Sequence, residues 1–135
     1  MSKVAVVFYS GSGNTEAMAD VIVNAIGADK IEAEGFGAAK VADYDAIVFG
    51  CPAMGDEVLE ETIFQPMWDD VKGSLASKKV ALFGSYGWGD GQWMRDWEAD
   101  AQSNGVTLAC ESVICNEAPD DEATAALEAL AKAIG

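Results

Sequence analysis

The chain has 135 residues, half of them hydrophobic, which is enough to bury a core and argues against disorder. It carries 23 acidic residues, 8 basic residues and no histidine, for a formal net charge of −15. That charge would repel nucleic acid and anionic lipid surfaces and attract a basic protein partner.

Apolar runs alternate with helical patterns along the whole chain. In order, we expect a strand at 3–9, a helix at 16–26, a short strand at 29–34, a strand at 45–50, a helix at 62–71, a strand at 79–84, a helix at 92–104, a strand at 107–115 and a helix at 121–134. Continuous apolar strands between helices indicate a parallel sheet buried on both faces. We therefore predict an α/β fold in one domain, residues 1–135: a five-stranded, parallel, doubly wound sheet with helices on both faces.

The remaining composition suggests a compartment. No apolar run approaches the roughly 18 residues of a membrane helix, and the N-terminus shows no signal-peptide pattern. Cys51, Cys110 and Cys115 form no Cys-x-x-Cys pair, so we expect three free thiols in a reducing compartment. These observations favour the cytoplasm and no membrane association.

The loop after the first strand has the composition of a phosphate-binding turn. It contains Ser10, Gly11, Ser12, Gly13, Asn14 and Thr15. Glycines let backbone N–H groups gather around an anion, and the following helix N-terminus adds partial positive charge. Because the lysine of nucleoside triphosphate loops is missing, the loop suits a single terminal phosphate. The alternative is an ordinary turn with a helix cap.

Two more loops leave the same edge of the predicted sheet, where ligands of doubly wound folds bind. The second loop contains Ala53, Met54, Gly55, Asp56 and Glu57, and the third contains Ser85, Tyr86, Gly87, Trp88, Gly89 and Asp90. Trp88, between two glycines, suits stacking on a flat ligand, with packing onto the core as the alternative. Met54 would be the other side of such a clamp. Trp93 and Trp97, one helical turn apart, are expected to pack their helix onto the sheet.

These three motifs, in this order, resemble those of the flavodoxin family of small electron carriers that contain FMN. The resemblance extends over the whole chain and is to the short-chain class, because there is no room for a long insertion in the last strand. It implies that residues 10–15, with Ser85, hold the FMN phosphate and that the flavin ring lies between Met54 and Trp88. It further implies that Glu57 accepts a hydrogen bond from flavin N3–H and that Asn116 reaches the ribityl chain.

The same resemblance implies a function. The chain would be a low-potential one-electron carrier rather than an enzyme, using the semiquinone/hydroquinone couple of noncovalently bound FMN. The Gly55 peptide would turn over when the flavin gains one electron and stabilise the neutral semiquinone. Acidic residues around the ring would disfavour the anionic hydroquinone and so lower the second potential.

Charge placement suggests how partners dock. Glu60 and Glu61 are expected as exposed acids near the flavin, and Lys3, Lys30, Lys78 and Lys79 at the opposite edge of the sheet. A monomer would then turn its flavin toward basic redox proteins that dock transiently.

Two other functions occur on similar folds. An FMN-dependent quinone or azo reductase would need room for a second substrate beside the ring, and turnover with NAD(P)H and a quinone would reveal it. A phospho-accepting receiver domain would need acids after the first and third strands. Those places hold Tyr9-Ser10 and Gly50-Cys51, so the sequence excludes it.

Overall fold

A computed structural model describes residues 3–11, 13–54, 58–87 and 91–135. The strands are β1 (Val4–Phe8), β2 (Asp29–Glu32), β3 (Ala46–Gly50), β4 (Lys79–Tyr86) and β5 (Val113–Asn116). The α-helices are α1 (Asn14–Ile26), α2 (Ala38–Val41), α3 (Phe64–Val71), α4 (Gln92–Ser103) and α5 (Asp121–Ile134). Two 3₁₀ turns, η1 (Ala33–Gly35) and η2 (Lys72–Ser74), complete the described elements.

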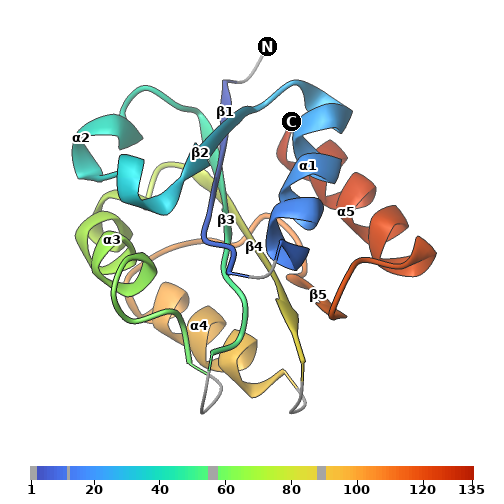
Figure 1. Ribbon diagram of the computed structural model, residues 1–135. Coiled ribbons are helices and arrows are strands. Elements are labelled where there is room, and N and C mark those ends of the chain that lie inside the picture. The colour runs from blue at the N-terminus through green and yellow to red at the C-terminus, as the bar shows by residue number, and fades with distance from the viewer. Residues whose placement is uncertain (1–2, 12, 55–57, 88–90) are drawn as a thin grey trace.

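The strands form one parallel sheet in the order β2-β1-β3-β4-β5. Helices α1 and α5 cover one face, and α2, α3 and α4 cover the other (Figure 1). The predicted α/β fold, with a five-stranded doubly wound sheet and helices on both faces, is confirmed. From β1 the chain first adds β2 on one side and then β3, β4 and β5 on the other. The strand order therefore reverses between β1 and β3, which is the switch point of the sheet.

Side chains of the two central strands alternate between two cores, as the strand period of two requires. Ala5 and Val7 face α3 and α4, whereas Val6 and Phe8 face α1 and α5. Because β1 and β3 are buried along their whole length, they read as continuous apolar runs. Trp93 and Trp97 are 1% and 2% exposed, which confirms that they pack α4 onto the sheet.

The last strand is shorter than the sequence indicated. Only Val113–Asn116 forms β5, and the earlier part of the predicted strand touches the sheet through a bridge between Val80 and Leu108. The chain then leaves the sheet, where the Ser112 hydroxyl donates to Glu98 at 2.6 Å. The prediction of a strand over 107–115 is therefore wrong for residues 107–112. Strand β4, in contrast, continues two residues beyond its predicted end, to Tyr86.

Candidate functional site

The carboxyl ends of β1, β3 and β4 meet around a pocket of about 330 Å³. Its described lining residues are Gly11, Asn14, Pro52, Ala53, Met54, Ser85, Tyr86, Gly87 and Glu117. The structure thus brings all three predicted loops together at the switch point. The lower end of the molecule in Figure 1 is this edge, because β1 starts at the top.

In the predicted phosphate-binding turn, the Ser10 hydroxyl accepts two backbone hydrogen bonds. The Ser10 oxygen accepts hydrogen bonds from the backbone N–H groups of Gly13, at 3.1 Å, and Glu16, at 3.2 Å. Gly13 has φ +93°, a conformation that favours glycine, and α1 begins at the next residue. The positive end of the α1 dipole therefore lies at Asn14, on the pocket wall.

A buried hydrogen bond joins the first loop to the third. The hydroxyl oxygens of Thr15 and Ser85 are 2.9 Å apart, and the two residues are 1% and 3% exposed. Ser85 lies in β4 and also lines the pocket. This bond fixes the first turn of α1 against β4, so the position of the anion-binding turn is set by the sheet.

Backbone hydrogen bonds join the described residues on either side of 55–57. Met54 and Val58 exchange two backbone hydrogen bonds, of 2.9 and 3.1 Å. Upstream of them, the Ala53 N–H donates to the Ser85 carbonyl at 3.0 Å. The backbone on both sides of residues 55–57 is therefore held, and Ala53 and Met54 form one wall.

Glu60 has a different role from the one expected. It is 5% exposed, and its carboxylate accepts from the N–H groups of Thr62, Ile63 and Phe64, at 2.8, 2.6 and 2.8 Å, and from the Thr62 hydroxyl. Burial raises the pKa of the Glu60 carboxyl, but these hydrogen bonds outweigh burial and lower it below its ordinary value. The prediction of an exposed steering charge is wrong for Glu60, which caps the start of α3, whereas Glu61 is exposed.

The far side of the pocket is built by the chain after β5. The Glu117 N–H donates to the Tyr86 carbonyl at 2.8 Å, and Glu117 has φ +60°, which is uncommon for a residue other than glycine. That turn places Glu117 on the pocket wall. Asn116 lines a separate hollow that runs from Tyr86 to Ala126 along α5.

Several predicted site residues lie outside the described part of the chain. They are Ser12, Gly55, Asp56, Glu57, Trp88, Gly89 and Asp90. Their proposed roles, including the clamp by Trp88 and the peptide change at Gly55, remain predictions.

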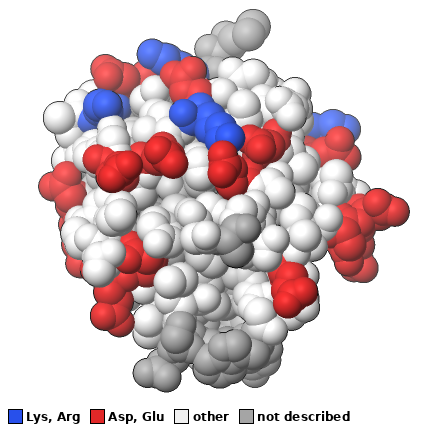
Figure 2. Space-filling view, viewed as in Figure 1, with Lys and Arg blue, Asp and Glu red and all other residues white. Residues whose placement is uncertain are grey.

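Several lysines lie away from this edge. Lys3 precedes β1 and Lys79 begins β4, so both lie at the amino edge of the sheet. The Lys and Arg side chains visible in Figure 2 lie in its upper half. Lys30 differs from the expectation, because it pairs with Val6 in the middle of β1. Its ammonium contacts Glu16 at 2.7 Å and Asp20 at 2.8 Å, and hydrogen bonds to Asp20 and Glu16 raise its pKa.

The described lining residues fit FMN. A pocket of this size falls within the range of about 300 to 1,000 Å³ found for small-molecule sites. The α1 N-terminus and the amide of Asn14 suit a phosphate group, while Met54 and Tyr86 offer apolar surface to a flat ring. Within the described residues, no cluster of acidic or cysteine side chains is arranged to hold a metal ion. The same part of the chain contains no helix long and apolar enough to span a membrane.

Comparison with known proteins gives the family. A sequence model of the family described as "Flavodoxin" matches residues 6–129. The chain is 45% identical to a flavodoxin of Megasphaera elsdenii over 123 residues, 87% of this chain and 89% of that protein. It is 42% identical to a flavodoxin of Clostridium beijerinckii over 121 residues, 86% and 88% of the two chains.

Solved structures agree with this result. The structure of two-electron reduced Megasphaera elsdenii flavodoxin has a TM-score of 0.86 at 42% identity, covering 96% of this chain and 98% of that one. Oxidised flavodoxin 1 from Bacillus cereus has a TM-score of 0.85 at 28% identity, covering 98% and 97%. The chain belongs to the flavodoxin family, and it is an FMN-binding electron carrier that serves redox partner proteins. No finding favours the quinone or azo reductase alternative.

Proposed function

We propose that this chain binds FMN in the pocket between its three loops and works as a low-potential, one-electron carrier. The observation that carries the proposal is the composition of the pocket wall, where the described residues include the acid Glu117 and no lysine or arginine. When bound, FMN supplies reversible one-electron chemistry on a ring that becomes negatively charged on full reduction. A wall without cations gives that charge no compensation, which lowers the second potential.

The residues of the chain bind and orient the cofactor. The turn at residues 10–15 holds the phosphate with backbone N–H groups, hydroxyls and the Asn14 amide, at the positive end of α1. Met54 covers one side of the ring, and Trp88 is proposed for the other. With both sides covered, no space is left for a stacked second substrate, so the chain needs partner proteins and turns over no substrate of its own.

The proposed partners are basic-surfaced redox proteins. The molecule has a charge asymmetry, because lysines lie at the amino edge and the segments 41–71 and 80–94, which contain the second and third pocket loops, have no lysine or arginine. Such an asymmetry orients encounters and speeds association. We also propose that the protein is a single domain in the cytoplasm. We propose that it is a monomer, because the net charge of −15 opposes self-association.

Spectroelectrochemical titration of the purified, FMN-loaded protein tests the potential. We expect a second one-electron potential below that of free FMN, since the site disfavours the added charge. A second potential equal to that of free FMN or above it would contradict the proposal.

Electron transfer to a basic protein acceptor tests docking. The rate should fall as salt is raised, because screening shortens the range of charge attraction to about 10 Å at 0.1 M ionic strength. A rate independent of salt would contradict basic-partner docking. Turnover of NAD(P)H with a quinone in the absence of any reductase would instead favour the enzyme alternative.

A further inference from the structure

The Cys51 carbonyl lies where the chain leaves β3 and turns toward the cofactor pocket. The Cys51 N–H donates to the Phe83 carbonyl at 3.1 Å and the Ala53 N–H to that of Ser85 at 3.0 Å. The chain from Cys51 to Ala53 therefore runs beside β4. Its orientation fixes where Pro52, Ala53 and Met54 stand on the pocket wall.

The Cys51 carbonyl is confined from two sides. On one side, the indole N–H of Trp93 donates to it at 3.2 Å from helix α4. On the other side is Gly84 of β4, where a Cβ atom would lie 2.2 Å from the same oxygen. Only a residue without a side chain allows this approach. The carbonyl thus fits between the β4 backbone and one buried indole.

The Trp93 ring also supports the opposite wall of the pocket. Its centroid lies 5.6 Å from that of Tyr86, with the planes inclined at 51°. Trp93 itself lines a groove between α3 and α4, and among described residues it is not part of the cofactor pocket. It therefore contacts Tyr86 on one wall and the carbonyl of Cys51, the residue just before the wall formed by Pro52, Ala53 and Met54.

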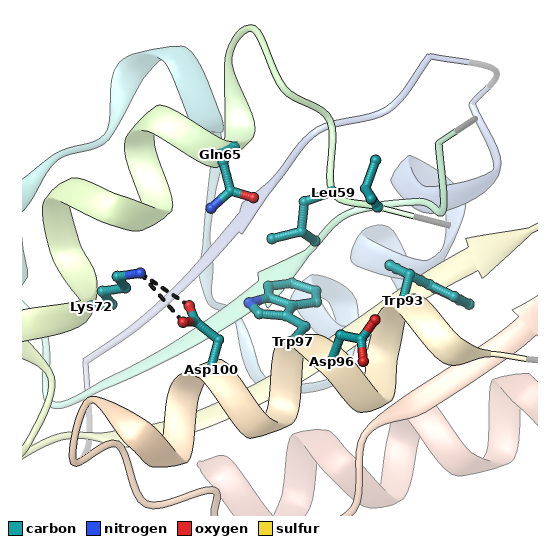
Figure 3. A pocket seen from close by; sticks show the side chains of 8 residues that line it. Leu59, Gln65, Lys72, Trp93, Asp96, Trp97 and Asp100 are labelled. Atoms are coloured by element: carbon teal, nitrogen blue, oxygen red, sulfur yellow. Dashed lines mark hydrogen bonds and ion pairs between the residues drawn. The ribbon is translucent and has the colours of Figure 1, made fainter. Parts of the chain in front are cut away.

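Trp97 provides a natural comparison one turn further along α4. Both indoles line the groove in Figure 3, and both are almost fully buried. Trp97 packs edge-on against Phe64 at 5.3 Å and Trp68 at 5.7 Å. Its buried Nε1, however, has no hydrogen-bond partner among the described residues. The two tryptophans thus differ in whether the indole N–H holds the backbone of the cofactor loop.

We propose that Trp93 is a positioning residue of the FMN site, which sets the affinity and the potential of the flavin by fixing the Cys51 carbonyl. The inference rests on the FMN site proposed above. Loss of the N–H would free the carbonyl, and the wall from Pro52 to Met54 would sample orientations that fit the flavin less well. The affinity for FMN would fall by a factor set by one hydrogen bond.

The test compares Trp93→Phe with Trp97→Phe. Each removes an indole N–H and a similar volume from the same buried region, so their packing costs are matched. We expect Trp93→Phe to weaken FMN binding roughly twofold to tenfold, the equivalent of one hydrogen bond. It should also change the visible circular dichroism of the bound flavin and its first one-electron potential. Trp97→Phe should leave all three unchanged, whatever its effect on urea unfolding.

Two results would overturn the proposal. One is unchanged FMN affinity, dichroism and potential in Trp93→Phe. The other is that FMN affinity, dichroism and potential change in both variants, each in proportion to that variant's loss of stability. That result would mean that packing alone matters. If Trp93→Phe does not fold, benzothienylalanine at position 93 keeps the ring shape and removes only the N–H, and the same outcomes apply.

A third variant separates this inference from the site on which it rests. Asn14→Ala removes a described wall residue at the phosphate turn. Weaker FMN binding in Asn14→Ala with unchanged Trp93→Phe would overturn the role of Trp93 and keep the site. Unchanged binding in both would overturn the site as well.

Discussion

The cap that Glu60 forms at the start of α3 is the most sharply testable feature outside the cofactor site. Glu60→Gln keeps the size of the side chain but leaves one acceptor oxygen in place of two. Since one oxygen accepts from Ile63 and Phe64 and the other from Thr62, the amide cannot serve both pairs. At least one charge-assisted hydrogen bond is lost, a net cost of about 1.5–3 kcal/mol.

Urea unfolding at pH 7, followed by far-ultraviolet circular dichroism at one fixed FMN concentration, measures this cost. With a denaturant dependence of about 2 kcal/mol per molar urea, we expect the midpoint to fall by roughly 1 M. The matched control is Glu61→Gln, the exposed neighbour, which should shift the midpoint little.

The pH dependence gives the sign of the effect. Because the pKa of Glu60 is lowered in the folded protein, the ionised carboxylate stabilises the fold fully above its ordinary value of 4.5. That contribution is lost as the pH falls through the folded pKa. The difference in unfolding free energy between the native chain and Glu60→Gln should therefore be constant from pH 7 to about 5 and shrink below that. Equal midpoints at pH 7, or a difference that grows on acidification, would refute the reasoning.

Three further predictions concern the pocket and the thiols. Ser85→Ala should destabilise the protein by about 1–3 kcal/mol, because the buried Thr15 hydroxyl loses its partner, and unchanged urea unfolding would contradict this. Trp88→Ala should weaken FMN binding by about 1–3 kcal/mol, in line with base stacking on aromatic side chains, and restore flavin fluorescence. The stacking assignment fails if affinity and fluorescence stay as they were. Maleimide should modify partly exposed Cys110 well before Cys51, because burial raises the pKa of the Cys51 thiol to about 12. Peptide mass spectrometry at pH 8 measures both rates, and equal rates would contradict this prediction.

The sequence was sufficient for the architecture because the relevant signals are local. The continuous apolar residues of β1 and β3 imply burial on both faces, and the boundaries of α5 follow from its periodicity and its acidic first turn. The three loops could be placed at one edge because parallel strands align their carboxyl ends. The pocket then follows from the topology.

Other parts of the site depend on contacts that no local pattern encodes. Glutamate is not a preferred N-cap residue, so Glu60 reads as a solvent-exposed acid until its three backbone donors are seen. The acceptor of the Trp93 N–H lies 42 residues earlier in the chain. The positive φ of Glu117 arises where the chain turns after β5, and glutamate gives no warning of it. The sequence signal that comes nearest to predicting this tight turn is the short interval between β5 and α5.

The way the chain leaves the sheet after Leu108 has a practical consequence for engineering. Between that bridge and the start of β5, the exposed residue Glu111 follows partly exposed Cys110, and neither lines the cofactor pocket. Lengthening a surface loop costs little chain entropy, about 0.6 kcal/mol for each doubling. A peptide tag or a small reporter domain inserted after Cys110 should therefore leave the protein able to fold and to carry electrons. The same segment offers a place to attach an electrode linker away from the residues that line the cofactor pocket.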